Sequence, residues 1–257
     1  MPSESTSWNL QLTGKRVVVT GASRGLGCAI AKAFAAEGAE LAIVYSQNKA
    51  AAEKTVDAIR DVGGTAHLFR SDVMDYSSVD EMMWAAVATL GGIDVLVNNA
   101  GILRRSFLSM TTTKDFAEVL NTNVLGTFHC IKAASRYMIK QKSGSIINIS
   151  SLAANRGLNG QGAYAASKGA VNSLTTVASK ELAPFGIRVN AISPGCIDAG
   201  MMKEFEDSSR QSYLKQIPLK RYGFSEEVAN AALFLASNLS SYVIGHALMV
   251  DGGMLIG

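Results

Sequence analysis

Three polar residues, Ser151, Tyr164 and Lys168, have the types and the spacing of a proton-transfer site. A phenol has an ordinary pKa of about 10, and an ammonium group four residues further along a helix shares its face and favours the phenolate. A serine hydroxyl can hydrogen-bond the same substrate oxygen and hold it in place. The trio can therefore protonate a carbonyl oxygen while its carbon accepts a hydride, or catalyse the reverse reaction. A tyrosine and a lysine at this spacing also occur by chance, so the surrounding elements must support the interpretation.

The segments on either side of these residues predict a position at the edge of a sheet. Residues 145–150 form an apolar, β-branched run that predicts a buried strand. After Lys168, apolar residues recur at helical spacing as far as Leu182, which predicts a helix. Ser151 then follows the carboxyl end of a strand, where ligands bind in open α/β sheets.

Composition limits the class of protein. The chain has 257 residues, of which 48% are hydrophobic and 18% charged, with a net charge of +3. These values are typical of a globular domain with a substantial core, and no cluster of Lys and Arg favours nucleic acid. Three scattered cysteines and three scattered histidines predict neither disulfides nor a metal site, as suits the cytoplasm. No apolar run reaches the roughly 18 residues of a membrane span, and no signal peptide is recognisable. We expect one domain over residues 1–257, with a loose arm over residues 1–13.

A glycine-rich turn follows the first predicted strand, residues 16–20. It contains Gly21, Gly25 and Gly27 in the spacing GxxxGxG and leads into a helix that ends near Gly38. Glycines let the backbone approach a pyrophosphate, and the amino terminus of a helix favours its negative charge. The setting between a strand and a helix predicts the first half of a dinucleotide-binding unit.

The end of the second predicted strand, residues 40–45, indicates which dinucleotide binds. An acid at this place often holds the ribose hydroxyls of NAD, but here Ser46 and then Lys49 follow the strand. Arg24 lies in the glycine-rich turn, and its rigid fork of donors suits a 2′-phosphate. We therefore predict NADPH, bound by Arg24 with help from Ser46 and Lys49. The alternative is that Arg24 is simply an exposed cation of a loop.

Two further strand ends have residues that suit a cofactor. Asp72 and Val73 follow the strand over residues 65–70, and a carboxylate there can accept from the adenine amino group or, alternatively, cap the next helix. Residues 98–101, Asn-Asn-Ala-Gly, follow the strand over residues 93–97. Their small side chains allow a flat ligand close to the backbone, and asparagine amides can join adjacent strands. A surface turn is the alternative.

Asn123 lies in a long, mostly helical stretch over residues 111–142. Asparagine is unfavourable inside a helix because its amide competes for backbone hydrogen bonds. A buried amide that bends the helix and holds a water near Lys168 would supply a proton path to Tyr164. A structural kink without a catalytic share fits the spacing equally well.

The last third of the chain continues the α/β pattern. Residues 187–193 predict a strand that Pro194 and Gly195 end sharply. Residues 196–223 are rich in flexible apolar side chains, which is typical of a lid over an apolar substrate arm. A helix capped by Ser225 and a last strand over residues 247–250 are expected to follow.

In this order the motifs resemble the short-chain dehydrogenases/reductases over nearly the full length of the chain. The matching residues are Thr20, Gly21, Gly25, Gly27, Asp72, Val73, Asn98, Asn99, Ala100, Gly101, Asn123, Ser151, Tyr164, Lys168, Pro194, Gly195, Asp251, Gly252 and Gly253. The resemblance implies a single-domain α/β fold of the Rossmann type, a doubly wound parallel sheet of seven strands with helices on both faces. It also implies a homotetramer.

The resemblance further implies roles for the site residues. Tyr164 would be the general acid, and Lys168 would lower its pKa while holding the nicotinamide ribose. Ser151 would orient the carbonyl, and Asn123 would anchor a water relay. The implied cofactor contacts are Gly21, Ser23, Arg24, Gly25, Leu26, Gly27, Ser46, Asp72, Val73, Asn99, Ala100, Gly101, Tyr164, Lys168, Pro194, Gly195 and Ile197.

Within that family the chain is most similar to the 3-oxoacyl-[acyl-carrier-protein] reductases, in its glycine-rich loop, its closing region and the 13-residue spacing from Ser151 to Tyr164. Two departures are visible. Ala199 stands where a Thr usually bonds the nicotinamide carboxamide. Phe185 stands at one of two basic positions that dock the carrier protein near the active-site mouth, and Lys142 is a candidate for the other.

Three functions follow from these patterns. The leading one is NADPH-dependent reduction of a 3-oxoacyl thioester, bound to an acyl carrier protein, in fatty-acid or polyketide biosynthesis. The second is a dehydrogenase that acts on the ketone or secondary alcohol of a free sugar, steroid or polyketide. The third is a dinucleotide-binding sensor without chemistry, which the presence of both Tyr164 and Lys168 disfavours. None of the three involves nucleic acid or a membrane.

Overall fold

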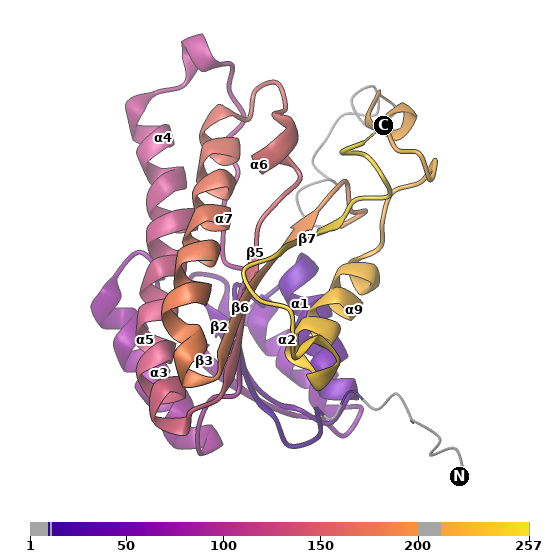
Figure 1. Cartoon of the computed structure of the whole chain (residues 1–257). Helices are drawn as coiled ribbons and strands as arrows, with labels where there is room; N and C mark the ends of the chain where they lie inside the picture. Colours follow the sequence, from indigo (N-terminus) through magenta and orange to yellow (C-terminus); the bar gives the residue numbers. More distant parts are fainter. Residues whose placement is uncertain (1–9, 11, 200–211, 257) are drawn as a thin grey trace.

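Seven strands form one all-parallel sheet in the computed structural model, which describes residues 10, 12–199 and 212–256. The strand order is β3-β2-β1-β4-β5-β6-β7, and every neighbouring pair is parallel (Figure 1). The strands are β1 Arg16–Thr20, β2 Glu40–Tyr45, β3 Thr65–Arg70, β4 Val95–Asn98, β5 Gly144–Ile149, β6 Ile187–Pro194 and β7 Ala247–Val250. The chain adds strands outward to β3 and then crosses over to β4, so the order reverses between β1 and β4. Ligands bind at such a switch point, beyond the carboxyl ends of the strands.

Helices cover both faces of this sheet (Figure 1). The first layer consists of α1 Gly25–Ala36, α2 Lys49–Arg60 and α9 Ser225–Ala236, and the second of α3 Tyr76–Leu90, α4 Thr113–Leu120, α5 Gly126–Gln141 and α7 Gly162–Leu182. The strands alternate between the two cores: Val17 and Val19 of β1 pack with the first layer, and Val18 packs with the second. Burial on both faces explains the apolar runs of the inner strands, whereas the edge strands β3 and β7 are only partly buried. The predicted doubly wound fold is confirmed.

Short helical turns complete the described chain. They are the 3-10 turns Leu108–Met110, Ala183–Phe185 and Asn238–Ser240, the π-helical turn Asn121–Leu125 and the single turn α6 Ala153–Arg156. Residues 212–215 are helical as well. No helix among the described residues is both long and apolar enough to cross a membrane. Within the same residues, no group of three or more His, Cys, Asp or Glu is arranged to hold a metal ion.

The long helix expected over residues 111–142 is interrupted where the sequence indicated. The π-helical turn Asn121–Leu125 separates α4 from α5, and Asn123 is completely buried within it. Single π turns of this kind are frequent at functional sites. The helix is therefore irregular at Asn123, where a bend was predicted, and the irregularity is a π-helical turn.

Three local expectations need correction. The loose arm over residues 1–13 lies mainly outside the described residues, but Leu12 is buried because its apolar side chain packs with the first helical layer. Ser225 does not cap α9: Phe224 precedes the helix, and its N–H donates to Glu227 Oε2 over 2.8 Å. Asp72 does not cap α3 either, because the cap is Asp75, which accepts from the N–H of Ser77 over 3.0 Å. The expected lid includes residues 200–211, which lie outside the described part.

Candidate active site

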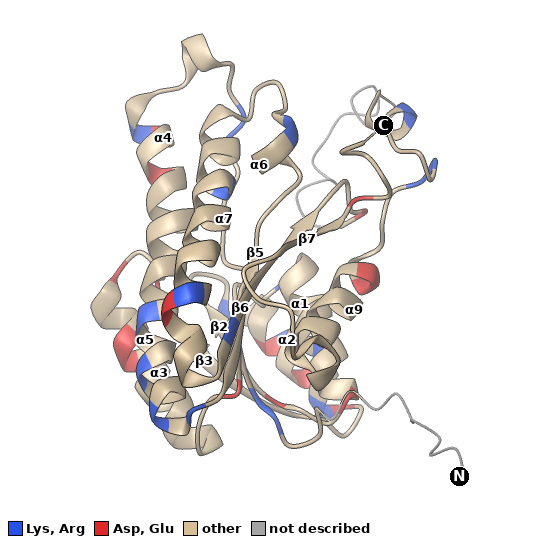
Figure 2. Cartoon of the chain, viewed as in Figure 1, with Lys and Arg blue, Asp and Glu red and all other residues tan. Residues whose placement is uncertain are grey.

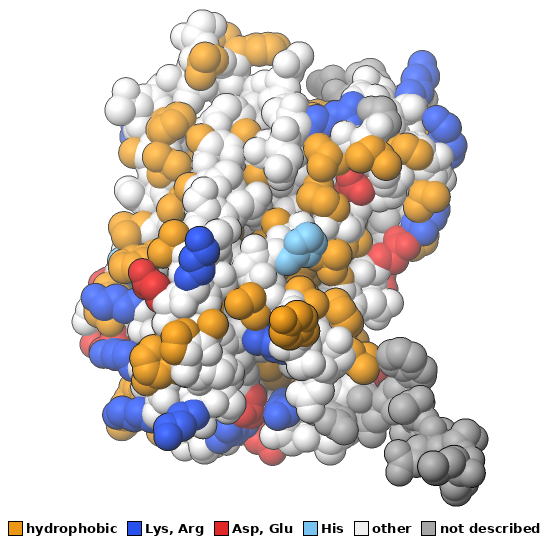
Figure 3. All heavy atoms as spheres, in the orientation of Figure 1, with side chains coloured by type: hydrophobic (Ala, Val, Ile, Leu, Met, Phe, Trp, Pro, Cys, Tyr) orange, Lys and Arg blue, Asp and Glu red, His pale blue; other side chains and the backbone are white. Residues whose placement is uncertain are grey.

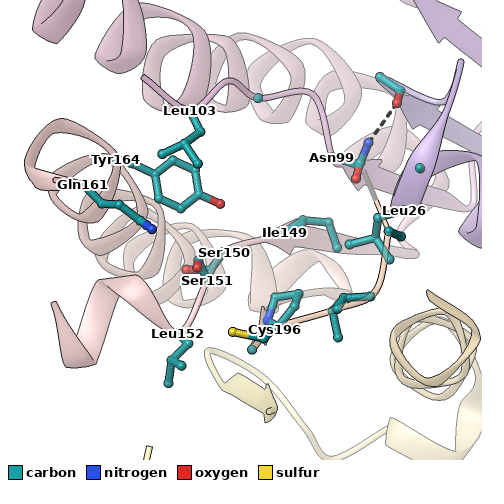
Figure 4. Close-up of a pocket in the computed structure, with 18 of the residues that line it drawn as sticks. Leu26, Asn99, Leu103, Ile149, Ser150, Ser151, Leu152, Gln161, Tyr164 and Cys196 are labelled. Atoms are coloured by element: carbon teal, nitrogen blue, oxygen red, sulfur yellow. Dashed lines mark hydrogen bonds between the residues drawn. The ribbon is translucent and has the colours of Figure 1, made fainter. Parts of the chain in front are cut away.

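A cavity of about 260 Å³ opens at the carboxyl ends of the central strands (Figure 4). Its wall combines the glycine-rich loop after β1 with residues that follow β4, β5 and β6. The predicted site residues in this wall are Gly21, Arg24, Gly25, Leu26, Gly27, Asn99, Gly101, Ser151, Tyr164, Pro194, Gly195 and Ile197. Ser23, Ala100, Asn123 and Lys168 are not part of this wall. The fold thus brings dinucleotide motifs and acid–base residues to one place.

Hydrogen bonds between β1 and β4 hold the glycine-rich loop in position. The Asn99 amide nitrogen Nδ2 donates to the carbonyls of Thr20 and Gly21, both over 3.0 Å. The Thr20 hydroxyl accepts from the N–H groups of Asn99 and Ala100, both over 3.1 Å. Gly21 has φ +63°, and a Cβ there would lie 2.8 Å from Ala100 Cα. The loop therefore requires glycine at this residue, for its backbone angle and for the close approach of β4.

The predicted role of the Asn-Asn segment in joining strands is confirmed for Asn98 as well. Its Nδ2 donates to Asn148 Oδ1 of β5 over 2.8 Å, and Asn98 is buried. Asn148 Nδ2 donates in turn to the Thr175 hydroxyl of α7 over 2.9 Å. The alternative of a surface turn is therefore wrong, because these amides connect two strands and a helix inside the protein.

Helix α1 directs its amino terminus at the cavity. Arg24 is exposed, lies in the cavity wall, and has an extended backbone just before Gly25, which begins the helix with φ +57°. The first N–H groups of a helix and its dipole favour an anion at this end. Arg24 adds a guanidinium at the same place, so a phosphate group fits here both geometrically and electrostatically.

Some of the residues predicted to bind the adenosine part of the cofactor line a second cavity, at the carboxyl ends of β2 and β3. This cavity has a volume of about 450 Å³, and Ser46, Arg70 and Asp72 are in its wall. Lys49, which the sequence places beside Ser46, instead forms an ion pair with Glu53 over 3.2 Å. Sequence reasoning missed Arg70, because no spacing rule places a residue from the end of β3 beside the loop that follows β2.

The phenol of Tyr164 projects from α7 into the first cavity (Figure 4). Burial raises the pKa of this phenol above its ordinary value, and a hydrogen bond with the Ser151 hydroxyl offsets part of the rise. The expectation that the phenol pKa is lowered is therefore wrong for this structure, because desolvation is the dominant effect. A phenol with a raised pKa is fully protonated near pH 7, as a general acid must be.

Lys168 lies one helical turn after Tyr164, in the interior of the protein. Its Nζ donates to the carbonyl of Ile149 at the end of β5 over 2.7 Å, and lies 5.6 Å from the centre of the Tyr164 ring. Burial lowers the pKa of this ammonium group to about 8. Lys168 is therefore mainly protonated at neutral pH and loses its charge as the pH rises through about 8.

Asn123 and Lys168 meet beside Gly101. A Cβ on Gly101 would lie 3.0 Å from Asn123 Oδ1 and 3.6 Å from Lys168 Nζ. The Asn123 amide is fully engaged: Oδ1 accepts from the Ile102 N–H over 2.8 Å, and Nδ2 donates to the Ile102 carbonyl and the Ser167 hydroxyl, both over 3.0 Å. The amide therefore fixes the loop after β4 against the first turns of α7.

Ser167 is a site residue that the sequence reasoning did not select. It is completely buried, accepts from Asn123, and donates to the carbonyl of Tyr164 over 2.7 Å. Its signal in the sequence is its place between Tyr164 and Lys168. The main-chain carbonyl of Asn123 also has a partner in the protein, the hydroxyl of Thr127 over 2.7 Å.

The motif at the end of β6 is held by the last strand. The Gly195 N–H donates to the Val250 carbonyl over 2.9 Å, and a Cβ on Gly195 would lie 2.7 Å from Asp251 Cα. Asp251 closes the following turn by accepting from the N–H groups of Gly253 and Leu255, over 3.0 and 2.8 Å. The Pro-Gly motif, which lines the cavity, and the Asp-Gly-Gly motif therefore pack against each other.

The remaining wall of the first cavity is mainly apolar. Its residues are Leu103, Ile149, Leu152, Leu158, Cys196, Ala199 and Tyr213, together with the polar Ser150 and Gln161. Burial raises the pKa of the Cys196 thiol to about 11, so this side chain is an uncharged thiol at neutral pH. Such a wall suits a hydrocarbon arm better than a polyol.

The expectation that Lys142 lies near the mouth of the site is wrong within one chain. Lys142 ends α5 directly before the amino end of β5, next to Gly186, which precedes β6. Tyr164 belongs to the opposite, carboxyl edge of the sheet. In Figures 2 and 3, Lys and Arg residues lie at the lower ends of α3 and α5, and others lie at α6 and at the upper right near the C-terminus.

The chain is similar to known proteins in sequence and in fold. A family model described as "Enoyl-(Acyl carrier protein) reductase" matches residues 21–255. The 3-oxoacyl-[acyl-carrier-protein] reductase FabG of Chlamydia muridarum is 42% identical over 247 residues, which cover 96% of this chain and 99% of that protein. The reductase of the same name from Staphylococcus aureus Mu50 is 41% identical over 240 residues, or 93% of this chain and 98% of the relative. Among solved structures, a short-chain type dehydrogenase/reductase from Mycobacterium marinum superposes with a TM-score of 0.91 at 36% identity, covering 96% of this chain and 97% of the other.

Proposed function

Because the chain belongs to the short-chain dehydrogenase/reductase family, we propose that it uses NADPH to reduce a 3-oxoacyl thioester on an acyl carrier protein to the 3-hydroxyacyl product. The observation that carries this proposal is the protonated Tyr164 phenol in the same cavity as the glycine-rich loop and the amino terminus of α1. A general acid and a dinucleotide cradle that face one cavity are the two parts that carbonyl reduction requires.

The residues of the first cavity fit a nicotinamide dinucleotide. Gly21 and Gly25 have no side chains, so a pyrophosphate can approach the backbone of this turn. The first N–H groups of α1 can then donate to the pyrophosphate. Lys168, one turn beyond Tyr164, would donate from Nζ to the nicotinamide ribose. The backbone after Pro194 would support the nicotinamide, since Ala199 supplies no hydroxyl. When bound, the cofactor supplies the hydride.

Each catalytic side chain then has one task in the reduction. Tyr164 donates its phenolic proton to the substrate carbonyl oxygen, whose carbon accepts the hydride, so that the ketone becomes a secondary alcohol. Ser151 hydrogen-bonds the same oxygen and fixes its position. Lys168 stabilises the phenolate that forms and returns a proton to it. Asn123 and Ser167 fix the loop after β4 against α7, which keeps Tyr164 and Lys168 in position.

The nature of the substrate is supported by the relatives and by the cavity wall. Both FabG relatives described above act, by their names, on 3-oxoacyl groups bound to acyl carrier protein. The apolar wall from Leu103 to Tyr213 offers room for an acyl chain. We expect the protein to be cytoplasmic. We also expect a homotetramer, because two large apolar side chains on adjacent helices are exposed: Trp84 of α3 exposes 67% of its surface and Phe128 of α5 exposes 42%.

An assay of NADPH oxidation with acetoacetyl thioesters of N-acetylcysteamine and of acyl carrier protein tests this function. Free ketones and secondary alcohols form the comparison panel at the same cofactor concentration. Tyr164→Phe should abolish turnover and leave the Kd for NADPH within about twofold, because the phenol acts on the reacting oxygen rather than on the cofactor phosphates. Thioesters that are not reduced at any chain length would refute the proposed substrate, and an active Tyr164→Phe variant would refute the proposed acid.

A further inference from the structure

The pairing of β2 with β3 brings an arginine to the adenosine end of the dinucleotide motif. Tyr45, the last residue of β2, is the register partner of Arg70, the last residue of β3. Arg70 therefore lies beside Ser46, and its Nε donates to the Ser46 carbonyl over 3.3 Å. The guanidinium is exposed. This contact anchors the arginine through a neutral carbonyl, so its charge is not compensated by the contact.

Arg70 lines the cavity of about 450 Å³ that opens at the ends of these two strands. In dinucleotide-binding folds, the group after the second strand decides between a ribose hydroxyl and a 2′-phosphate. No acid follows β2 here: the residues are Ser46, Gln47 and Asn48. The position therefore lacks the carboxylate that would repel a phosphate.

The two acids of this cavity, Asp72 and Asp75, accept hydrogen bonds from backbone N–H groups. Asp72 Oδ1 accepts from the Met74 N–H, and Asp75 Oδ1 accepts from the Ser77 N–H, both over 3.0 Å. Both carboxylates thus belong to the turn that starts α3. Lys49, the nearest lysine in sequence, is paired with Glu53. Of the cations near the end of β2, Arg70 is the one held in place without a carboxylate partner among the described residues.

We propose that Arg70 is a specificity residue for the 2′-phosphate of NADPH, acting together with Arg24. The inference rests on the proposed use of NADPH and adds a residue from a third strand to the site. With Nε committed to the Ser46 carbonyl, the Nη groups of Arg70 supply donors for phosphate oxygens. Arg24 belongs to the glycine-rich loop and lines the first cavity, and Arg70 lies at the end of β3 and lines the second. Lys49 contributes less than the sequence suggested, because Glu53 compensates its charge.

Two adenosine nucleotides isolate this contact from the rest of the cofactor. Adenosine 2′,5′-bisphosphate and AMP differ only in the 2′-phosphate, and calorimetry gives their Kd values for the full-length protein. Arg70→Gln should raise the Kd of the bisphosphate about tenfold, as expected for the loss of one exposed charge-assisted hydrogen bond. The Kd of AMP should stay within about twofold of the wild-type value. The loss should shrink at high salt, because exposed charges are screened.

Arg60→Gln is the matched control. Arg60 is an exposed arginine that also donates to a β3 carbonyl, that of Ala66, over 2.7 Å, but it lies near the opposite end of the strand. This variant should bind both nucleotides as the wild type does. Arg24→Gln should also weaken binding of the bisphosphate. Arg70→Lys should retain part of the wild-type affinity for the bisphosphate, because lysine keeps the charge but lacks the planar fork of donors of the guanidinium.

The outcomes separate this inference from the proposed function. A wild type that binds both nucleotides equally would refute the use of NADPH itself. A wild type that prefers the bisphosphate and loses that preference in Arg24→Gln but not in Arg70→Gln would refute the role of Arg70 alone. If Arg70→Gln lowers the affinity for both nucleotides equally, Arg70 only supports the loop at Ser46. That result would also refute the inference.

Discussion

The buried ammonium group of Lys168 predicts a specific dependence of stability on pH. Its pKa is about 8 in the folded protein against an ordinary value of 10.5. Below pH 8 the lysine is protonated in both the folded and the unfolded state. Between pH 8 and pH 10.5 the folded state releases its proton first, so the unfolded state binds more protons and stability rises with pH. At 1.36 kcal/mol per pKa unit, the contribution between pH 7 and pH 10 is about 2–3 kcal/mol.

Lys168→Met removes this titration and keeps most of the side-chain volume. The variant loses the buried charge but also the hydrogen bond to the Ile149 carbonyl, whose loss costs about 1–3 kcal/mol. The two effects oppose each other near pH 7, so the difference in stability there is small. The pH dependence is the decisive quantity, because a methionine cannot titrate.

Urea unfolding of the wild type and of Lys168→Met at several pH values from 7 to 10 measures this effect. The free energy of unfolding of the wild type, minus that of the variant, should rise by about 2–3 kcal/mol over the range. Lys180→Met, an exposed substitution on the same helix, should follow the wild type. A difference between wild type and Lys168→Met that stays constant with pH would refute the reasoning, because it would mean that burial does not depress this pKa.

Three further substitutions test the geometry of the site. Gly21→Ala should lower the free energy of unfolding by about 1–3 kcal/mol, because φ is positive and the new Cβ would meet Ala100; thermal unfolding measures this, and an unchanged Tm would contradict it. Ser167→Ala should lower kcat several-fold with little change in KM, because it releases the Asn123 amide from α7, and an unaltered kcat would show that the amide needs no such support. Ala199→Thr should tighten NADPH binding several-fold by adding a hydroxyl to the cavity wall, and fluorescence titration with the nucleotide would reveal an unchanged Kd if the hydroxyl does not reach it.

The order of the elements could be predicted with good accuracy. The strands expected over residues 16–20, 40–45 and 65–70 have the same bounds in the structure. Apolar runs determine strands such as β1 and β2 locally, because these strands are buried inside the sheet. The edge strand β3 is only partly buried. The irregularity at Asn123, a π-helical turn, was predictable for a local reason, since an amide inside a helix competes with the backbone.

The sequence by itself determined the strand–turn–helix order, the glycine positions and the serine, tyrosine and lysine that meet at one sheet edge, because periodicity and spacing encode these features locally. The tertiary structure alone decided which charges are partnered and which groups are buried. It turned Lys168 toward Ile149, raised the pKa of Tyr164, placed Lys142 at the far edge and brought Arg70 to Ser46. Strand register and desolvation depend on residues distant in the chain, so no local pattern contains them.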